Sequence, residues 1–393
     1  MNYPQLVLLP KKERSIINRH PWIFSGAVKQ IRNASDGDIV EIVGNDAKVL
    51  GYGFYSQKSQ IVCRMFEWSD HPQDFETVEY WQKKIESAIL LRKGTVFNNS
   101  TNTYRLIHAE GDFLPGIIID VYAEVAVLQI LITGVERIKT LIQSALLNLG
   151  FNHLYLKTKV SAHVLEDVQK ESEWLSGGVA APVIVRENDV TFAVDFVKGQ
   201  KTGFFIDQRD NRKLLESYCE GKRVLNAFSY SGGFSVYALK GKAIEVCSLD
   251  ISKDAIATAE ENVRMNGYDS NHKVIVKDCF EYLKDMEENL FDIIVLDPPA
   301  FAKHARAVEN ASRGYKQINL RAFQKIRPNG IVFTFSCSQN ISKDLFQKIV
   351  FSAAADARRN VRIIHQLHQP LDHPINIFHP EGEYLKGLVL SVE

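Results

Sequence analysis

Residues 224–235 read VLNAFSYSGGFS, and residues 245–250 read EVCSLD. The short apolar run that opens the first stretch is typical of a buried strand. Gly232 and Gly233 follow at the turn, where a residue without Cβ lets the backbone bend tightly and lets a ligand come close. The second strand ends at Asp250, whose carboxylate can accept hydrogen bonds from both hydroxyls of a ribose. The two stretches therefore predict the nucleoside end of a Rossmann-like unit.

The spacing of these glycines separates two classes of nucleotide ligand. A dinucleotide-binding unit uses G-x-G-x-x-G, so that a pyrophosphate can sit on the N-terminus of a helix. Here Gly232 and Gly233 have no third glycine, and the chain has no G-x-x-x-x-G-K-[ST] phosphate loop. A ligand with a ribose but no phosphate fits better, so we expect S-adenosylmethionine. A tight turn in an α/β protein without a ligand is the alternative that this stretch leaves open.

The composition predicts an ordinary soluble protein of two or three domains, because the 393 residues are 45% hydrophobic and 24% charged. The formal net charge is zero, which argues against a polybasic tail but not against a local basic groove. Five scattered cysteines show neither the spacing of a zinc site nor a disulfide frame, which favours a reducing cytoplasm. We expect no signal peptide, because the apolar run at residues 6–10 is too short, and no membrane span, because the most apolar window carries Asp120 and Glu124.

Residues 1–68 have the pattern of a small β domain, with short strand-like runs broken by glycine, asparagine and serine. A basic run there leads into RHPWIFSG, residues 19–26, which places cations beside aromatic rings. Arg19 and Trp22 could therefore hold a phosphate and stack a base. The alternative is a solvated charge run beside aromatic residues of the core.

Residues 69–198 predict a helix followed by a compact α+β domain. Apolar residues recur with the period of a helix over residues 74–94. The domain that follows reads strand, strand, helix, strand, strand, over residues 114–121, 125–130, 137–149, 154–157 and 190–197. No motif in this part of the chain carries obvious chemistry.

Residues 199–393 change to alternating strands and helices, which predicts a mostly parallel sheet with helices on both faces. The last two strands have no helix between them and should pair antiparallel. The helices expected after Asp250 span residues 253–266, 279–286, 317–326 and 343–355. Ligands bind such sheets beyond the carboxyl ends of the strands. The residues expected at those ends, and therefore around one crevice, are Phe228, Asp250, Asp278, Asp297 and Cys337.

Two of these strand ends carry chemistry. In DPPAF, residues 297–301, two prolines fix the backbone and remove two donors, so carbonyls and the Asp297 carboxylate can accept hydrogen bonds from an exocyclic amino group. A flat nucleobase fits that description, and a strand end stopped by prolines is the alternative. Cys337 is either a buried core thiol or a nucleophile, and a base held opposite it by Asp297 favours the nucleophile. The four histidines after residue 360 lie on opposite strand faces or in loops, so we expect no metal site.

Taken together, the motifs resemble the ribosomal RNA large-subunit methyltransferases of the RlmI type, which make 5-methylcytosine. The likeness covers nearly the whole chain. The matching segments, in order, are RHPWIFSGA at 19–27, KTGFFIDQR at 201–209, NAFSYSGGF at 226–234, DPP at 297–299, RGYK at 313–316 and FSCS at 335–338. The resemblance implies a PUA domain over residues 1–68, a central α+β domain over 69–198 and a class I methyltransferase domain over 199–393.

The resemblance also implies roles for individual residues. Cys337 would be the nucleophile that adds to C6 of cytosine, and Asp297 would hold the N3/N4 edge of the base. The residues expected to bind S-adenosylmethionine are Phe204, Gln208, Asn226, Phe228, Ser229, Gly232, Gly233, Asp250 and Asp278. Those expected to contact the RNA are Arg19, Trp22, Pro298, Pro299 and Phe301. The expected partner is 23S ribosomal RNA, without a membrane or a metal, and a homodimer is left open.

Two departures and two rivals accompany this hypothesis. Many relatives have lysine where this chain has Ala300, which could change the grip on the substrate. Other RNA cytosine-5 methyltransferases often carry a second cysteine where this chain has Ala300 and Phe301, so another base must remove the C5 proton. One rival is a guanine-nitrogen methyltransferase in which Cys337 is inert. The other is an RNA-binding assembly factor with a non-catalytic Rossmann-like domain.

Overall fold

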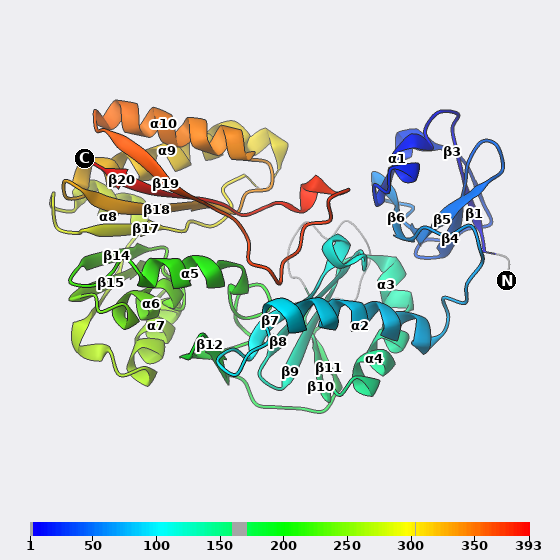
Figure 1. The fold of residues 1–393 in the computed structure, drawn as a ribbon, viewed down its shortest axis with the longest axis horizontal. Coiled ribbons are helices and arrows are strands. Elements are labelled where there is room, and N and C mark those ends of the chain that lie inside the picture. The colour runs from blue at the N-terminus through cyan, green and yellow to red at the C-terminus, as the bar shows by residue number, and fades with distance from the viewer. Residues whose placement is uncertain (1–2, 159–170, 303) are drawn as a thin grey trace. The chain divides into compact units, whose positions relative to one another are not determined.

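The computed structural model describes residues 3–158, 171–302 and 304–393. The chain divides into two compact units, shown as part of the whole fold in Figure 1. Unit 1 comprises Met1–Val185, Val194–Ile206 and Leu371–Gly382, and unit 2 comprises Arg186–Ala193, Asp207–Pro370 and Glu383–Glu393. This division differs from the three predicted domains, whose boundaries stay a prediction.

The N-terminal part of unit 1 is a six-stranded sheet with strand order β2-β6-β5-β4-β1-β3. Its pairings are antiparallel except that of β1 with β4, which is parallel. Apolar residues that alternate along the strands form its core, Leu6, Val40 and Ile42 among them. The β structure expected at the N-terminus is therefore confirmed. The elements are β1 (Gln5–Leu8), α1 (Arg14–Ile17), β2 (Trp22–Phe24), β3 (Val28–Arg32), β4 (Ile39–Val43), β5 (Val49–Tyr55) and β6 (Ile61–Glu67).

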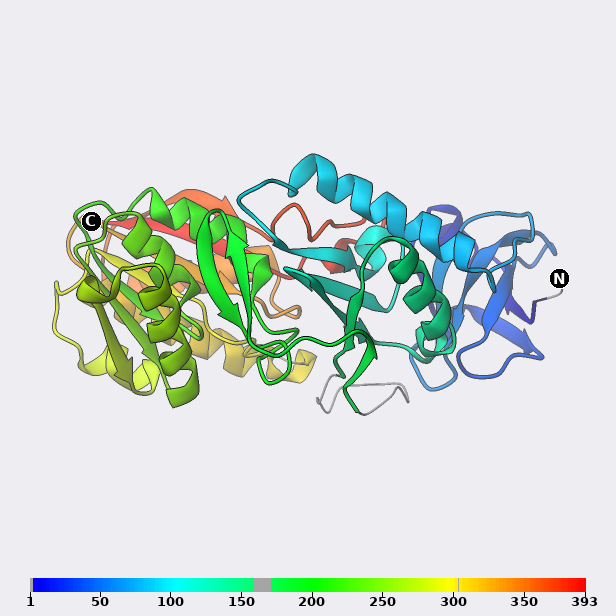
Figure 2. The same cartoon turned by 90° about the horizontal axis from the view of Figure 1, so that it is seen from below.

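The rest of unit 1 is built on a five-stranded sheet with strand order β11-β10-β9-β8-β7, beside which the long helix α2 runs (Figure 2). The helix expected from residue 74 begins at Val78, while Phe75 is buried ahead of it and accepts a hydrogen bond at its carbonyl from the Trp81 indole, 2.8 Å away. The elements are α2 (Val78–Thr95), β7 (Thr103–His108), β8 (Ile117–Tyr122), β9 (Val125–Ile130), α3 (Thr133–Arg137), α4 (Lys139–Asn148), β10 (His153–Leu156) and β11 (Glu173–Ser176).

The strand expected over residues 190–197 is shorter and lies elsewhere than predicted. It is β13 (Val190–Val194), which forms a two-stranded sheet with β12 (Val183–Glu187) rather than extending the five-stranded sheet. The backbone amides of Thr191 and Ala193 donate to the side chains of Asn266 and Asn262, at 3.0 and 2.8 Å, and all four residues belong to unit 2. These side-chain acceptors hold the hairpin in place, and an apolar alternation cannot reveal them.

Unit 2 is a seven-stranded sheet with strand order β16-β15-β14-β17-β18-β20-β19. The first five strands are parallel, and β20 pairs antiparallel with both β18 and β19, as expected. The strands are β14 (Arg223–Ala227), β15 (Glu245–Asp250), β16 (His272–Val276), β17 (Ile293–Leu296), β18 (Gly330–Ser336), β19 (Val361–Leu367) and β20 (Lys386–Val392). The predicted mostly parallel sheet is confirmed.

Helices cover both faces of this sheet, with α5, α6 and α7 on one side and α8, α9 and α10 on the other (Figure 1). Helix α9 begins nine residues before the helix expected over 317–326. The sequence signal there is weakened by Gly314, where a Cβ would lie 3.2 Å from the Phe301 ring. The helices are α5 (Arg209–Glu216), α6 (Gly233–Lys240), α7 (Lys253–Met265), α8 (Cys279–Asp285), α9 (Val308–Lys325) and α10 (Lys343–Ala357).

Candidate functional site

The carboxyl ends of three neighbouring strands in unit 2 bring the predicted residues to one edge of the sheet. Strand β17 lies between β14 and β18, and Leu296 is paired with Ala227 on one side and with Thr334 on the other. Because all three strands are parallel, the residues that follow them leave from the same edge. These strand ends therefore lie along one edge of the sheet, as predicted, whereas their convergence on one crevice and the roles of their residues stay predictions.

The loop between β14 and α6 has an unusual backbone. Phe228 and Tyr230 adopt left-handed conformations, with φ of 59° and 46°, which bulky residues rarely do. Gly232 also has a positive φ of 76°, and a Cβ there would lie 2.8 Å from the Cβ of Ala259 in α7. The glycine is thus required by the packing of two helices, a reason that the sequence alone did not give. Such concentrated strain is typical of functional loops.

Two carboxylates at this edge are held by backbone amides. Asp250 accepts hydrogen bonds of 2.9 Å from the amides of Tyr230 and Ser252, one at each carboxylate oxygen. Asp278 caps α8, since its Oδ1 accepts from the amides of Phe280 and Glu281 at 2.9 and 3.1 Å. Each carboxylate oxygen can accept more than one hydrogen bond, so both acids stay able to receive a ligand donor.

Asn226 lies behind the loop, in a chain of buried polar side chains. Its Nδ2 donates to Ser235 at 2.9 Å, and the chain continues through Ser248 at 2.6 Å to His272 at 2.8 Å. Burial lowers the pKa of His272 to about 4, so these hydrogen-bonded side chains are uncharged near neutral pH. Asn226 therefore supports the loop from inside. Among the described residues, two buried polar atoms of this segment have no hydrogen-bond partner: Oδ1 of Asn226 and the hydroxyl of Ser229.

Gln208 orients the carboxylate of Asp297. Its Nε2 donates to Asp297 Oδ1 at 3.0 Å, and its Oε1 accepts from Asn211 at 2.7 Å. Gln208 is buried, so the amide is fixed at both ends. The resemblance assigned Gln208 to the cofactor, and the hydrogen bond to Asp297 is a contact that sequence reasoning missed.

Cys337 follows β18 and faces the loop that follows β17. Its Sγ lies 4.0 Å from the carbonyl oxygen of Pro298. The next residue, Ser338, joins the two loops because its Oγ accepts from the amide of Ala302 at 3.1 Å and bonds the Tyr315 hydroxyl at 2.9 Å. Cys337 is partly exposed, while the other four cysteines are buried. Burial raises the pKa of three of those thiols, Cys219, Cys247 and Cys279, to about 12.

The three residues expected to contact the base after Asp297 differ in exposure. Pro298 is buried and Pro299 is exposed. The ring of Phe301 is partly buried, with its centroid 4.7 Å from that of Tyr315 and 5.8 Å from that of Phe280. Pro299 is thus the most accessible of the three, and Phe301 is packed between α8 and α9.

The residues of unit 1 that were predicted to bind RNA or cofactor differ in exposure and in their contacts. Arg19 is exposed, with a left-handed backbone of φ 64°. The Trp22 indole donates to Glu110 at 2.8 Å, and its ring lies 4.3 Å from that of His379. Trp22 therefore already makes contacts within the protein. Phe204 is buried, and its amide donates to the Tyr122 hydroxyl at 3.2 Å.

Comparison with known families decides what kind of protein carries this site. The profile of S-adenosylmethionine-dependent methyltransferases matches residues 112–379, and that of PUA-like domains matches residues 6–68. The chain belongs to the S-adenosylmethionine-dependent methyltransferase family. It has the class I methyltransferase fold with an N-terminal PUA-like domain, as the sequence predicted, and its cofactor is S-adenosylmethionine.

Relatives of this methyltransferase span its full length. Proteins from Shewanella denitrificans and Aeromonas salmonicida are 41% and 42% identical to it, with 99% and 98% of each chain covered, and both are named ribosomal RNA large subunit methyltransferase I. Two solved structures cover 100% of both chains. One, from Streptococcus mutans, is described as a candidate S-adenosylmethionine-dependent methyltransferase, with 24% identity and a TM-score of 0.84. The other is a candidate methyltransferase in complex with SAH, with 25% identity and a TM-score of 0.85.

The loop residues of the methyltransferase fit this cofactor. Ser229 offers a buried hydroxyl that has no partner in the described part of the chain and that a bound ligand can satisfy. The Asp250 carboxylate is fixed at the end of the second strand, where a ribose is expected. Within the described part of the chain, no cluster of three or more histidine, cysteine or acidic side chains could hold a metal ion. In the same residues, no helix is long and apolar enough to cross a membrane.

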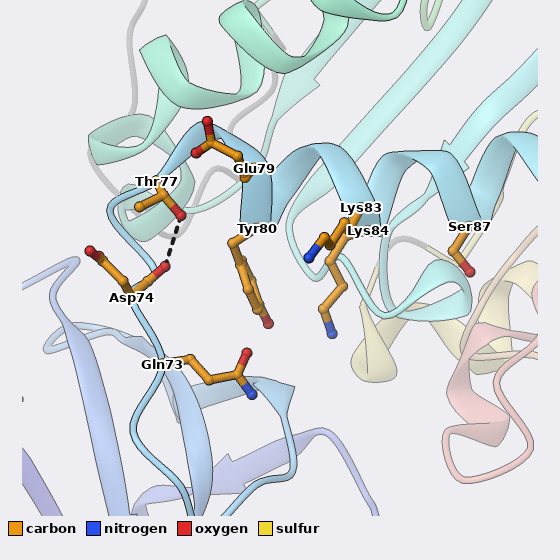
Figure 3. A pocket seen from close by; sticks show the side chains of 8 residues that line it. All are labelled: Gln73, Asp74, Thr77, Glu79, Tyr80, Lys83, Lys84 and Ser87. Atoms are coloured by element: carbon orange, nitrogen blue, oxygen red, sulfur yellow. Dashed lines mark hydrogen bonds between the residues drawn. The ribbon is translucent and has the colours of Figure 1, made fainter.

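Two hollows in the molecule lie apart from these residues. One, of about 340 Å³ in unit 1, is lined by side chains from the segment before α2 and from the first half of that helix, including Asp74, Tyr80 and Lys84 (Figure 3). The other, of about 410 Å³ in unit 2, is lined by Glu245 and Lys273, which stand at the amino ends of β15 and β16. Ligands of such sheets bind at the opposite, carboxyl ends. Neither hollow therefore belongs to the candidate site.

Proposed function

We propose that this protein methylates C5 of a cytosine in 23S ribosomal RNA, with S-adenosylmethionine as the methyl donor. The name shared by its full-length relatives supports the large-subunit ribosomal RNA as substrate. The observation that carries the choice of base and atom is the pairing of Cys337 with the Asp297 strand end, where Sγ lies 4.0 Å from the Pro298 carbonyl. A thiol that can add to C6 and a carboxylate that can hold the base, at adjacent strand ends, are two of the groups that cytosine C5 chemistry needs.

The chemistry requires covalent help because C5 of cytosine is a poor nucleophile. The Cys337 thiolate adds to C6, which makes C5 enamine-like, and C5 then attacks the sulfonium methyl group. Removal of the C5 proton by a base breaks the Sγ–C6 bond and restores the aromatic ring. S-adenosylmethionine supplies the methyl group and leaves as S-adenosylhomocysteine.

Asp297 is assigned to the N3/N4 edge of the cytosine. Its carboxylate can accept from the exocyclic amino group, and Gln208 holds it in one orientation at 3.0 Å. Fixed hydrogen-bond partners preserve the geometry that brings two reacting groups together. The base has to leave its stack to reach this site, which costs a few kcal/mol and costs least in a loop of the RNA.

The remaining residues of the site bind cofactor and RNA. Asp250 accepts the ribose hydroxyls and Asp278 the adenine amino group, because both carboxylates stand at carboxyl ends of strands. For RNA capture by unit 1 we favour the exposed Arg19, and Phe24, which is 47% exposed, is the accessible aromatic residue of the same segment. Trp22 is a weaker candidate since Glu110 and His379 already engage it.

The proposal is tested by identifying the modified nucleoside. Ribosomal RNA lacking the modification is incubated with enzyme and S-adenosylmethionine, digested to nucleosides and analysed by mass spectrometry. We expect 5-methylcytosine with the native enzyme and none with Cys337→Ala. A methylated guanine formed equally by both proteins would replace the proposal with the guanine-nitrogen rival. No product and no cofactor binding would favour the assembly-factor rival.

A further inference from the structure

Lys386 is a buried lysine at the end of the sheet where Cys337 lies. It is 3% exposed, on strand β20, and is directly paired with Ser336 of the antiparallel strand β18. Its Nζ donates to the carbonyl oxygen of Ser338 at 2.7 Å. Lysine is almost never buried unless its charge has a partner. Lys386 thus contacts Ser336 and Ser338, and Cys337 lies between them in the sequence.

The Cys337 thiolate is one of two negative charges that act on Lys386. Burial lowers the pKa of Lys386 to about 8, while the charges of Cys337 and Glu383 act in the opposite direction and raise it. Glu383 is itself paired with Lys343 at 3.0 Å. Tyr315, from α9, also faces Cys337, but burial raises the pKa of its hydroxyl, so it stays neutral. At neutral pH most Lys386 side chains are protonated, and their positive charge is available to a thiolate.

We propose that Lys386 is a positioning residue that stabilises the thiolate form of Cys337 before it attacks the base. An ammonium group near a thiol favours the ionised form through direct electrostatic attraction. The Ser338 carbonyl holds the ammonium beside the loop that carries the nucleophile. This inference rests on the proposed function, because it assigns Cys337 the role of nucleophile.

The test measures ionisation of Cys337 directly, without RNA or cofactor. The full-length protein is alkylated with iodoacetamide over a range of pH, and the modified cysteine peptides are quantified by mass spectrometry. The midpoint of the rate profile is compared rather than the rate at one pH, because a thiolate of lower pKa is also a weaker nucleophile. In Lys386→Met we expect the Cys337 midpoint to rise by about one to three pH units. In Lys386→Arg, which keeps the charge, it should stay near the native value.

Two controls separate electrostatics from misfolding. Lys343→Met removes an exposed lysine of the same neighbourhood and should leave the midpoint unchanged. The four buried cysteines stay protected from iodoacetamide in any folded variant. If Lys386→Met does not fold, the native protein still decides, because the proposal requires its Cys337 midpoint to lie below about 8.5, the value of a free thiol.

An unchanged midpoint in folded Lys386→Met, or a native midpoint at or above that of a free thiol, would overturn the inference. Failure of the proposed function is seen in a different experiment, as methylation that persists in Cys337→Ala. The two failures are therefore distinguishable, since alkylation reports the charge coupling and the methylation assay reports the role of the thiol.

Discussion

Gln208 donates a 3.0 Å hydrogen bond from Nε2 to Oδ1 of Asp297, across 89 positions of the sequence. The opposite end of the same amide accepts from Asn211, and the side chain is buried. The amide therefore cannot turn without losing one of its two partners. This relationship ties the segment that opens α5 to the residue that we assign to the cytosine.

Gln208→Ala should slow methylation while leaving cofactor affinity nearly intact. A hydrogen bond to a charged group contributes about 1.5–3 kcal/mol, which corresponds to a loss in turnover of roughly ten- to a hundredfold. Single-turnover kinetics and calorimetric titration with S-adenosylmethionine measure the two effects separately. If affinity for the cofactor fell instead and turnover with saturating cofactor did not, Gln208 would be a cofactor residue, as the resemblance suggested.

Asp250→Ala should weaken binding of S-adenosylmethionine roughly ten- to a hundredfold, because it removes acceptors for the ribose hydroxyls. It also frees the amides of Tyr230 and Ser252. The matched control is Asp254→Ala, an exposed acid four residues further along the chain, in α7. Calorimetry on both variants decides, and equal affinity in Asp250→Ala and the native protein would contradict the assignment.

Arg19→Asn should weaken binding of a ribosomal RNA fragment and reduce the slope of log affinity against log salt by about 1, as expected for one lost phosphate contact. Asparagine is chosen because it tolerates the left-handed backbone of this position better than alanine. Removing the whole N-terminal sheet is a poorer test, since Phe54 and Phe66 pack on Trp81.

Filter-binding titrations at several salt concentrations measure both quantities for Arg19→Asn. The control is Lys48→Ala, whose side chain is 80% exposed and faces Asp46. Cofactor affinity should be the same in all three proteins. An unaltered salt slope in Arg19→Asn would remove Arg19 from the RNA interface.

The protein should lose stability as the pH falls from about 6.5 to 4, in part through His272. Burial lowers the pKa of this histidine from 6.5 to about 4 in the folded state. The unfolded state then binds the proton more tightly, so unfolding is favoured as the pH falls through this window. Allowing for the partial exposure of His272, protonation of this residue should lower the free energy of unfolding by roughly 2–3 kcal/mol.

Thermal unfolding at pH 7 and pH 4.5 checks the contribution of His272. His272→Gln should show a smaller drop in melting temperature than the native protein, whereas His71→Gln, at an exposed position, should show the same drop. Equal drops in all three proteins would mean that His272 does not contribute to acid unfolding.

The sheet and the edge that carries the site were predictable because both follow from local patterns. Apolar runs ending in Ala227, Asp250 and Leu296 mark buried parallel strands, and parallel strands end at one edge. The bond from Gln208 to Asp297 and the burial of Lys386 beside the Cys337 loop were not predictable. The first joins two side chains 89 positions apart, and the second joins the Lys386 side chain to a backbone carbonyl 48 positions away; no periodicity encodes which polar groups meet at such separations.

Other differences between the predicted and the observed structure have causes that cannot be read from the sequence. Phe228 and Tyr230 take left-handed conformations that their residue types disfavour, so only the fold shows the strain. The start of α9 was missed because Gly314 is a poor helix former, and it is tolerated there because the Phe301 ring leaves little room for a side chain. The contacts of Trp22 with Glu110 and His379 were not predictable either, because both partners lie far from it in the sequence. The contact of Trp22 with RNA stays a prediction.

The most direct test of Cys337 uses an RNA fragment with 5-fluorocytosine at the target position. Addition of Sγ to C6 and methyl transfer proceed, but fluorine cannot leave C5 as a proton does, so the covalent complex should persist. With S-adenosylmethionine present, a denaturing gel should show a shifted protein–RNA band for the native enzyme and none for Cys337→Ala, which should still bind the cofactor. Absence of the band with active native enzyme, or its survival in Cys337→Ala, would contradict the role of Cys337 as the nucleophile.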